Sequence, residues 1–539
     1  MIKRALLIVV LAAGLLQAQE AFDRILHSEK EPQNWLTYSG SVNGQRYSPL
    51  TQITPGNAKN LELQWIWQAK SLEKYEATAL VVDGVLYTVT GASPSTPTTN
   101  DVVAMDAATG RLYWTYTYTN ATFNACCGRV IRGLAILGDT LYMGTLDAHL
   151  LAIDAKTGKL IWNSTVADAA ARYSITHAPL VVHDKVIVGT AGGDGPIRGL
   201  LAAFDARTGK EVWRVNTIPG AGEPGNETWG GDAWKTGGAG IWNTGAYDPE
   251  TNLTFWGTGN PSGGSDWTGV TRPGDNLYSD SVLALDADTG KMKWYYQFTP
   301  HDEMDYDSTQ VPVLADIEFQ GKLRKVMLWA NRNGLWYVLD RTSGEFLMGK
   351  PFTTVNWMDG FDTKGRPHRV AGKVPGPNAP VIMPTVLGGT NWYPPSYSPK
   401  TGLFYIPAWE NTGTIATGNF PQATGDTPMA APTLATNKKT ETEGFGVVRA
   451  FDPRTGNKKW EYKMSDITWA GVLSTAGDMV FSGGREGYFF GLDARNGELL
   501  WKLNLGGQVN SGPMSYAVNG RQFVTVAAGN SLYAFALRQ

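Results

Sequence analysis

The sequence predicts an all-β protein, an eight-bladed β-propeller built from repeats in which a tryptophan docks on the neighbouring blade. Two observations carry this prediction. The 539 residues include 63 glycines and 20 tryptophans, and many turns combined with many large aromatic side chains favour β-sheets over helical bundles. An eleven-residue pattern also recurs along the chain, which is the signature of a repeat architecture.

The repeat consists of a strand, an Asp-x-x-Thr-Gly turn and a second strand that ends in tryptophan. Six copies keep it closely: "AMDAATGRLYW" ending at Trp114, "AIDAKTGKLIW" at Trp162, "AFDARTGKEVW" at Trp213, "ALDADTGKMKW" at Trp294, "AFDPRTGNKKW" at Trp460 and "GLDARNGELLW" at Trp501. A degenerate copy, "VLDRTSGEFLM", has Met348 in the tryptophan position. The segment "NLELQWIWQ" around Trp65 resembles an eighth outer strand without its turn. Eight such strands predict eight blades.

Each position of the repeat has a physical reason. The aspartate accepts hydrogen bonds from turn amides, and the glycine adopts the positive φ that tight turns require. The tryptophan is expected to pack against the next blade, which is a structural role. The shortest spacings, 41 residues from Trp460 to Trp501 and up to 51 from Trp162 to Trp213, suit one four-stranded sheet per repeat. The strand near Trp65 is expected to complete the last blade beside 530–537, which closes the ring and removes exposed strand edges.

The chain divides into a leader and one large domain. The start "MIKRALLIVVLAAGLLQA" combines two basic residues, a short apolar run and a small residue, as a cleavable secretory signal does. We expect a signal peptide over 1–18, a single propeller domain over 19–539 and a soluble periplasmic protein without a membrane span. A proline-rich stretch at 374–384 and a polar run at 416–444 are expected to be surface loops, the second beside a site entrance.

Charge and motifs exclude several function classes. The formal net charge is −3, from 46 basic and 49 acidic residues, so the chain has no basic stripe for a nucleic-acid partner. The six histidines lack zinc-type spacing. The sequence contains no Gly-x-Ser-x-Gly elbow, no phosphate-binding loop and no Cys-x-x-Cys-His motif for a covalent haem.

The only two cysteines, Cys126 and Cys127 in "NACCGR", are adjacent. Such a pair cannot join distant segments, and adjacent Cα atoms lie about 3.8 Å apart, below the usual disulfide range of roughly 4.4–6.8 Å. A bond between them would be a strained eight-membered ring, and the alternative is two reduced, buried thiols. An oxidising, exported compartment favours the disulfide.

These residues resemble a known family, the pyrroloquinoline quinone (PQQ)-dependent alcohol dehydrogenases, which include the large subunits of methanol dehydrogenases. The resemblance covers nearly all of the chain after the leader. Tryptophan-docking repeats alone are weakly specific, because non-enzymatic assembly factors share them. Their combination with "CCGRVIRG", "GTGNP", "TPHDEMDYD" and "NRNGLWYVLDR" is highly specific. The resemblance implies a propeller enzyme that oxidises an alcohol with PQQ.

In this family the quinone lies between the vicinal disulfide and a tryptophan. Cys126 and Cys127 match the first face, and Trp242 in "GGAGIWNTGAYDP" matches the second, with propeller packing as its alternative role. The family's polar ring around the three PQQ carboxylates, together with one further tryptophan, corresponds here to Glu76, Arg132, Thr176, Ala191, Gly192, Asn391 and Trp469. The planar donor fork of an arginine suits a carboxylate. For Trp469 a structural role is an open alternative.

Family members also hold a hard cation against the quinone with protein oxygen ligands. Asn260 and Asp305 match two of these ligand positions, and Asp194 falls where the family usually has glutamate, one methylene longer. Asp307 follows two residues after Asp305, where calcium-dependent relatives have a small or neutral residue and lanthanide-dependent relatives have aspartate. A further carboxylate adds negative charge that a trivalent cation uses better than Ca²⁺. The resemblance therefore implies one lanthanide ion, with Ca²⁺ as the alternative metal. For Asp307 the alternative role is that of an ordinary solvated acidic residue in a loop.

The resemblance also implies a mechanism and partners. Asp305 would be the base that takes the hydroxyl proton of the alcohol, and Arg332 in "NRNG" would orient it while a hydride passes from the carbinol carbon to the quinone. Electrons would leave to a soluble cytochrome c, since the chain carries no haem motif of its own. A homodimer is compatible with the family, and primary alcohols are its common substrates.

Two alternatives stay open at this level. The chain could be a calcium-dependent alcohol dehydrogenase with the same quinone chemistry. It could also be a non-catalytic propeller that binds other proteins, although such propellers need neither adjacent cysteines nor a carboxylate cluster. An aldose dehydrogenase is disfavoured, because the site motifs resemble those of methanol dehydrogenases.

Overall fold

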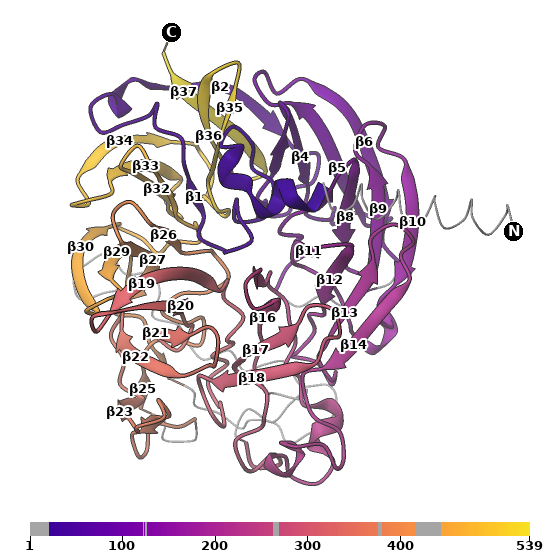
Figure 1. Cartoon of the computed structure of the whole chain (residues 1–539), viewed down its shortest axis with the longest axis vertical. Coiled ribbons are helices and arrows are strands. Elements are labelled where there is room, and N and C mark those ends of the chain that lie inside the picture. Colours follow the sequence, from indigo (N-terminus) through magenta and orange to yellow (C-terminus); the bar gives the residue numbers. More distant parts are fainter. Residues whose placement is uncertain are drawn as a thin grey trace, which may run out of the picture.

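The computed structural model describes residues 21–121, 123, 127–261, 269–375, 380–415 and 444–538. In this part of the chain, eight antiparallel sheets stand around a common centre (Figure 1). The predicted all-β class and the eight blades are therefore confirmed. Helix among these residues is limited to 21–26 and five short 3₁₀ segments, η1 (Ser28–Lys30), η2 (Ala58–Asn60), η3 (Ala169–Ala171), η4 (Asn226–Thr228) and η5 (Ala233–Thr236). None of the described helices is long and apolar enough to cross a membrane.

The first four blades follow each other along the chain, and each begins with the strand nearest the centre of the ring. The first blade has β3 (Leu80–Val82), β4 (Val85–Val89), β5 (Thr99–Asp106) and β6 (Leu112–Thr119). The second has β7 (Ala135–Leu137), β8 (Thr140–Gly144), β9 (His149–Asp154) and β10 (Leu160–Thr165). The third has β11 (Leu180–Val182), β12 (Lys185–Gly189), β13 (Leu200–Asp205) and β14 (Glu211–Asn216). The fourth has β15 (Ala246–Asp248), β16 (Leu253–Gly257), β17 (Ser281–Asp286) and β18 (Met292–Gln297).

The next three blades keep this order, with insertions between them. The fifth has β19 (Val313–Phe319), β20 (Lys322–Ala330), β21 (Leu335–Asp340) and β22 (Phe346–Pro351). The sixth has β26 (Ser396–Ser398), β27 (Leu403–Glu410), β29 (Phe445–Asp452) and β30 (Asn457–Lys463). The seventh has β31 (Leu473–Thr475), β32 (Met479–Gly483), β33 (Tyr488–Asp493) and β34 (Leu499–Asn504), and β1 (Tyr47–Ser48) pairs with β31 in parallel. Two small additional sheets, β23 (Met358–Phe361) with β24 (Pro367–Arg369) and β25 (Val381–Ile382) with β28 (Thr414–Ile415), belong to the insertions.

The last blade joins the two ends of the described chain. It contains β35 (Met514–Val518), β36 (Arg521–Ala528) and β37 (Ser531–Leu537), and β2 (Leu61–Gln68) pairs with β37 as its outermost strand (Figure 1). The register runs from Leu61 opposite Leu537 to Gln68 opposite Ser531. The predicted closure of the ring by the strand near Trp65 is confirmed.

The repeat tryptophans dock on the neighbouring blade as the sequence predicts. The indole N–H of Trp114 donates to the carbonyl of Ala155 at 3.1 Å, and that of Trp162 donates to Ala206 at 3.2 Å. Equivalent bonds join Trp65 to Ala107, Trp213 to Ala287, Trp460 to Ala494 and Trp501 to Leu61. The repeat aspartates accept from turn amides, as Asp154 does from Thr157 at 2.7 Å.

The turn glycine is required by the same contact. Gly158 has a φ of 70°, and a Cβ added to it would lie 2.6 Å from the ring of Trp114. Gly456 lies in the same way against Met348, where the added Cβ would be 2.7 Å from the sulfur. Met348 therefore takes the place of the docking tryptophan in the degenerate repeat.

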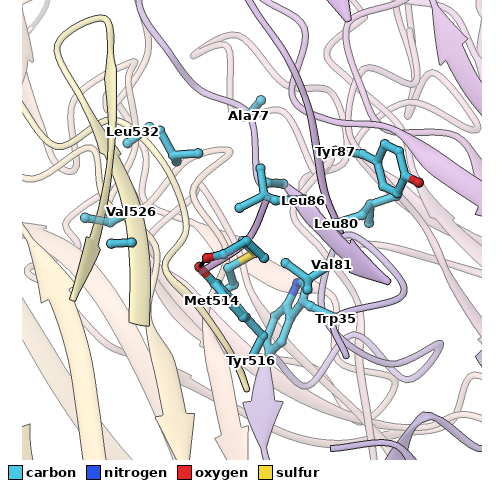
Figure 2. Packing of buried hydrophobic residues seen from close by; sticks show 14 of the residues in the cluster. Trp35, Ala77, Leu80, Val81, Leu86, Tyr87, Met514, Tyr516, Val526 and Leu532 are labelled. Carbon is cyan, nitrogen blue, oxygen red and sulfur yellow. Dashed lines mark hydrogen bonds between the residues drawn. The ribbon is translucent and has the colours of Figure 1, made fainter. Parts of the chain in front are cut away.

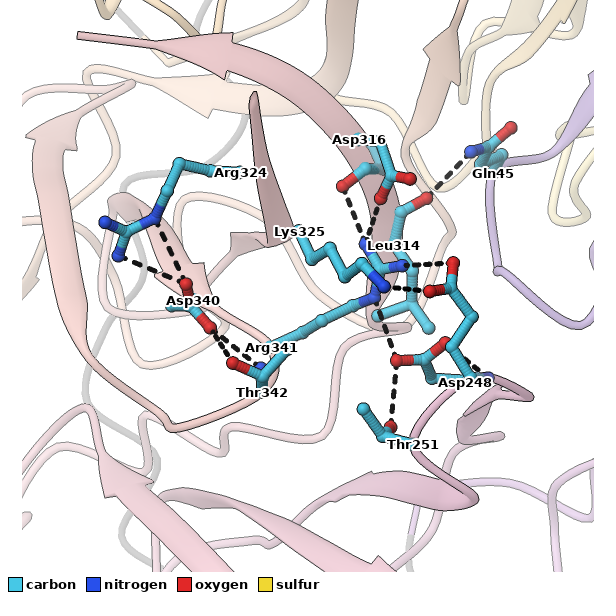
Figure 3. Close-up of polar contacts among 12 residues, drawn as sticks. Gln45, Asp248, Thr251, Leu314, Asp316, Arg324, Lys325, Asp340, Arg341 and Thr342 are labelled. Carbon is cyan, nitrogen blue, oxygen red and sulfur yellow. Dashed lines mark hydrogen bonds and ion pairs between the residues drawn. The ribbon is translucent and has the colours of Figure 1, made fainter. Parts of the chain in front are cut away.

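One blade junction departs from the pattern. The indole N–H of Trp294 has no hydrogen-bond partner among the described residues. At this junction the turn aspartate is followed by Arg341, where five other repeats have alanine. Arg341 donates to Asp248 at 3.1 Å and to Asp316 at 2.5 Å, and Lys325 pairs with Glu250 beside it (Figure 3). An ion-pair group therefore joins the fourth and fifth blades, with Arg341 and Asp248 buried and the other three side chains partly exposed.

The largest apolar cluster lies where the ring closes. Figure 2 shows Met514 and Tyr516 of the last blade beside Trp35, with Val81 and Leu86 of the first blade close by. The hydroxyl of Tyr516 donates to the carbonyl of Ala107 at 2.7 Å. Closure thus combines strand pairing with burial of apolar side chains from both ends of the chain, the main favourable contribution to folding.

Candidate active site

The predicted site residues gather at one end of the ring. Most of them precede the innermost strand of a blade: Glu76, Arg132, Thr176, Trp242, Asp305, Asp307, Asn391 and Trp469. The others follow the second strand of a blade: Ala191, Gly192, Asp194, Asn260 and Arg332. Because neighbouring antiparallel strands run in opposite directions, the start of the first strand and the end of the second lie at the same end of a blade. This geometry brings together residues from all around the ring, although some of them are nearly 400 positions apart in the sequence.

Backbone hydrogen bonds connect the inner ends of successive blades. The amide of Thr78 donates to the carbonyl of Arg132 at 2.9 Å, and the amide of Arg132 donates to the carbonyl of Thr176 at 2.9 Å. The hydroxyl of Thr176 then donates to the carbonyl of Trp242 at 3.1 Å. The first four blades therefore place their predicted site residues next to each other.

Glu76 and Arg132 form a buried ion pair at this end. Glu76 Oε2 and Arg132 Nη2 lie 3.0 Å apart, and both side chains are less than 9% exposed. Burial raises the pKa of Glu76 above its usual value, and the nearby Arg132 guanidinium opposes that shift. Arg132 Nη1 also donates to the Thr176 hydroxyl at 3.1 Å.

Two tryptophans flank Arg132. The centre of its guanidinium lies 5.2 Å from the ring centroid of Trp242 and 5.1 Å from that of Trp392, within cation–π range. Trp392 was not among the predicted site residues, although it directly follows the predicted Asn391. Its position next to the predicted Asn391 is the signal in the sequence that could have found it.

Asn391 and Trp469 lie in the loops of the sixth and seventh blades. The side-chain amide of Asn391 donates from Nδ2 to the carbonyl of Leu387 at 2.8 Å, and its Oδ1 accepts from the backbone amide of Trp392 at 2.9 Å. The side chain of Asn391 therefore holds its own loop in shape. The half-buried ring of Trp469 packs edge-on against Trp409 at 4.9 Å, and the Lys74 ammonium lies 5.9 Å from it. Trp469 therefore has packing partners and is only half-buried, so both of its predicted roles stay open.

Ala191 and Gly192 follow β12 and place main chain at the same end of the ring. Ala191 donates from its amide to the carbonyl of Ser174 at 2.7 Å. Gly192 has a φ of 111°, and a Cβ added to it would lie 2.3 Å from the carbonyl oxygen of Arg172. Position 192 therefore requires glycine.

The predicted cysteine pair is only partly described. Cys126 lies outside the described residues, so its bond to Cys127 stays a prediction. Cys127 itself has a φ of 66° and begins the segment that leads to Arg132. The leader and the polar run at 416–443 also lie outside the described residues.

A second group of side chains is built around Arg332. Its Nη2 lies 2.5 Å from Asp305 Oδ2 and its Nη1 lies 2.5 Å from Asp307 Oδ2. Asp305 has a φ of 60°, so the segment is not extended there, yet both carboxylates reach the same guanidinium. Burial raises the pKa of both aspartates, and the Arg332 charge opposes this.

Asn260 and Asp194 complete this group. The backbone amide of Asn260 donates to Asp307 Oδ1 at 2.7 Å, while its side-chain Nδ2 is buried and has no partner. Asp194 is half-buried, and burial together with the nearby charge of Asp307 raises its pKa to about 6. A hydrogen bond from the Trp242 side chain lowers the pKa of Asp307, which connects this group to the Arg132 group.

Residues 35–355 match the family described as the β-propeller domain of glucose, ethanol and alcohol dehydrogenases that use PQQ. The chain belongs to the PQQ-dependent alcohol dehydrogenases. It is therefore a quinoprotein enzyme that oxidises alcohols, as the resemblance implied. Residues 444–539 also match outer membrane protein assembly factor BamB, whose family shares these repeats. The relatives described below are dehydrogenases, and their similarity extends over nearly the whole chain. The alternative of a non-catalytic propeller is therefore excluded.

Known relatives cover most of this quinoprotein. The quinoprotein alcohol dehydrogenase PedH of Pseudomonas putida is 36% identical, over 96% of this chain and 90% of the relative. The 1-butanol dehydrogenase (cytochrome c) of Thauera butanivorans is 37% identical, over 92% of this chain and 74% of the relative. A solved europium-containing methanol dehydrogenase has a TM-score of 0.86 at 31% identity, and the match covers 96% of this chain and 100% of that one.

The residues of this quinoprotein fit an anionic cofactor. Arg132 Nε is buried and has no hydrogen-bond partner among the described residues, so a donor is available to a carboxylate. The indole rings of Trp242 and Trp392 offer apolar surface for a planar ring system. The Arg132 group therefore has the two properties that binding of PQQ requires.

The Arg332 group of the quinoprotein fits a hard cation by its donor atoms. Asp305 Oδ1 is buried and unpartnered in the described structure, and Asp194 and Asn260 add further oxygens. Oxygen ligands of this kind suit Ca²⁺ and trivalent hard cations. No group of three or more His, Cys, Asp or Glu residues is preassembled for a metal in the described part of the chain. Arg332, which pairs with Asp305 and Asp307, occupies carboxylate oxygens that a cation would have to share.

Proposed function

We propose that this PQQ-dependent alcohol dehydrogenase uses Asp305 as its catalytic base and a lanthanide ion as its Lewis acid. Bound PQQ supplies the hydride acceptor, and a bound cation stabilises negative charge that develops on it. The observation that carries the proposal is the arrangement of Asp305, Asp307 and Arg332 at the site end of the ring.

Asp305 has one oxygen free for proton transfer. Its Oδ2 pairs with Arg332, whereas its buried Oδ1 has no partner among the described residues. Arg332 thus fixes the orientation of the carboxylate and favours its ionised form, since a cationic neighbour lowers a carboxyl pKa. Oδ1 is then the atom that would accept the hydroxyl proton of the alcohol.

Four residues would hold the cation: Asp194, Asn260, Asp305 and Asp307. Asp307 contributes the extra negative charge that favours a trivalent ion over Ca²⁺. The similar europium-containing methanol dehydrogenase supports this choice, since its match covers its whole chain. One observation favours calcium as the second candidate: both oxygens of Asp307 already have partners, Arg332 and the amide of Asn260.

The quinone would lie beside Trp242 and be held by the Arg132 group. Arg132 would bind a carboxylate of PQQ, and Thr176, Ala191, Gly192, Glu76 and Asn391 would line the surrounding ring, with Trp469 at its edge. The face opposite Trp242 is assigned to a Cys126–Cys127 disulfide. A rigid, apolar floor of this kind would keep the quinone flat against the indole.

Export and electron transfer complete the proposal. We assign residues 1–18 as a cleaved signal peptide, residues 19–539 as one propeller domain and the periplasm as the location. A soluble cytochrome c would accept the electrons, which is supported by the name of the similar 1-butanol dehydrogenase (cytochrome c). Primary alcohols are the proposed substrates, and a homodimer is the proposed assembly.

The test is dye-linked alcohol oxidation by purified protein reconstituted with PQQ and either Ca²⁺, La³⁺ or Ce³⁺, over a panel of alcohols. Wild type and Asp307→Ala are compared under each metal. Activity with the lanthanides alone that is lost in Asp307→Ala supports the proposal. Activity with Ca²⁺ alone, unaffected by Asp307→Ala, would contradict the lanthanide assignment and support the calcium candidate.

A further inference from the structure

Asp280 is a carboxylate that the proposed mechanism does not use. It lies directly before β17, and the start of a third strand is at the same end of a blade as the site. The residue is 0% exposed, and neither of its side-chain oxygens has a hydrogen-bond partner in the described structure. A buried carboxylate without partners is costly unless something else at the site compensates for it.

The backbone of Asp280 is attached to the cation group. Its amide donates to the carbonyl of Gly259, the residue before Asn260, at 3.0 Å. Gly259 packs so closely on Asp307 that a Cβ added to it would lie 2.5 Å from Asp307 Oδ1. Asp280 and Asp307 therefore contact the same glycine.

The charges that surround Asp280 are mostly negative. Burial raises the pKa of Asp280 well above its usual value, the carboxylates of Asp302, Asp307 and Asp305 raise it further, and the guanidinium of Arg272 opposes them. Together with Asp194 and Arg332, these groups comprise five carboxylates and two guanidiniums, a formal charge of −3 when all are ionised. This excess of carboxyl groups over guanidiniums, drawn from the third, fourth and fifth blades, leaves negative charge for a bound cation to neutralise.

We propose that Asp280 is a further selectivity residue of the cation site, whose charge favours a trivalent over a divalent ion from behind the four proposed ligands. This inference rests on the proposed cation site. The Coulomb attraction between a negative charge and a cation grows with the charge of the cation, so an ionised Asp280 attracts a +3 ion more strongly than a +2 ion at the same distance. Its charge therefore changes the ratio of the two binding affinities. Low exposure preserves the effect, since solvent screening is weak there.

The experiment measures the dissociation constants of Eu³⁺ and Ca²⁺ by calorimetric titration of the PQQ-loaded protein. Wild type is compared with Asp280→Asn, which keeps the shape of the side chain and removes its charge. Asparagine also tolerates the φ of 45° at this position. Asp275→Asn is the matched control, because it removes one charge from the same loop at a partly exposed ion pair with Arg366.

The expected result for Asp280→Asn is a fall of at least about tenfold in the preference for Eu³⁺ over Ca²⁺, with no such change for Asp275→Asn. Equal changes in both affinities, or none, would overturn the inference. A wild type that binds neither ion would instead refute the cation site itself. The metal-free variant supplies a second readout: Asp280→Asn should unfold at no lower temperature than wild type, because it replaces a buried carboxyl group that has no hydrogen-bond partner in the described structure with an uncharged amide of the same shape. A lower unfolding temperature would assign Asp280 a structural role; if this variant is recovered poorly, Asp280→Ser removes the same charge.

Discussion

Arg332 Nη1 lies 2.5 Å from Asp307 Oδ2, and both side chains are less than 9% exposed. The second nitrogen of the same guanidinium pairs with Asp305. In the metal-free protein, Arg332 thus supplies positive charge to the buried carboxylate of Asp307 and the half-buried carboxylate of Asp305, which a cation would also neutralise. Arg332 and a bound cation therefore stabilise the same oxygens, and each should partly substitute for the other.

Arg332→Gln is expected to destabilise the metal-free protein by about 3 kcal/mol or more, because breaking a buried ion pair leaves uncompensated charge. La³⁺ should raise the urea midpoint of the variant more than that of wild type, since the ion replaces the lost positive charge. The measurement is urea unfolding of both proteins with and without La³⁺. Identical midpoints under all conditions would show that the pair does not stabilise this end of the ring.

Arg132→Lys is expected to weaken PQQ binding by about tenfold or more. Lysine keeps the charge, but it loses the planar fork that pairs with a carboxylate and the stacking between Trp242 and Trp392. The measurement is equilibrium dialysis of PQQ against wild type and variant. Arg129→Lys is the control, because this arginine lies three residues earlier in the same segment and, in the described part of the chain, its backbone amide contacts Glu73 instead of a site residue. Unchanged retention of PQQ by Arg132→Lys would remove Arg132 from the proposed quinone site.

The sequence predicts the ring better than it predicts the site. Turn aspartates, turn glycines and docking tryptophans are local signals, and each repeat forms its contacts with the next blade in the same way. The position of Gly158 against Trp114 follows from that repetition. The contact between Arg132 and Trp392 does not, because it depends on loop conformations in two blades far apart in the sequence. Asp280 was missed for the same reason: only the fold shows that its carboxylate is buried without a partner.

Arg341→Ala is expected to cost about 3 kcal/mol, although alanine stands at this position in five other repeats. The substitution leaves Asp248, only 2% exposed, without the guanidinium that it contacts in Figure 3. The double variant Arg341→Ala with Asp248→Asn should recover most of the loss, because no buried unpaired charge is left and the remaining partner, Asp316, is exposed. Urea unfolding of both variants tests this coupling, and a double variant as unstable as the single one would contradict it.

Gly158→Ala is expected to destabilise the protein more than Gly402→Ala does. The two glycines have nearly the same φ, 70° and 67°, so each alanine carries the same left-handed cost of about 1–2 kcal/mol. Only at Gly158 does the new Cβ approach a docking tryptophan, at 2.6 Å from Trp114, whereas no atom lies within 4 Å at Gly402. Overpacking should add about 1–3 kcal/mol, measured as the difference in urea unfolding. Equal losses would mean that the tryptophan can shift without cost.

His177 makes stability depend on pH. The ring is fully buried beside Thr176; its Nδ1–H donates to the carbonyl of Ala178 at 2.8 Å and its Nε2 accepts from the amide of Gly189 at 2.9 Å. Burial lowers the pKa of His177 to about 4 from an ordinary 6.5, because the charged form loses its water. The unfolded chain therefore binds a proton between these values that the folded protein does not.

Its contribution to stability is complete above about pH 6.5 and is lost as the pH falls toward 4, by about 3 kcal/mol in total. Replacement by glutamine removes the titrating group, so the fall in urea midpoint between pH 6.5 and 4 should be smaller in His177→Gln than in wild type. The exposed His368 supplies the control, and His368→Gln should keep the wild-type slope. If His177→Gln and wild type show the same slope, the acid sensitivity of the fold lies elsewhere.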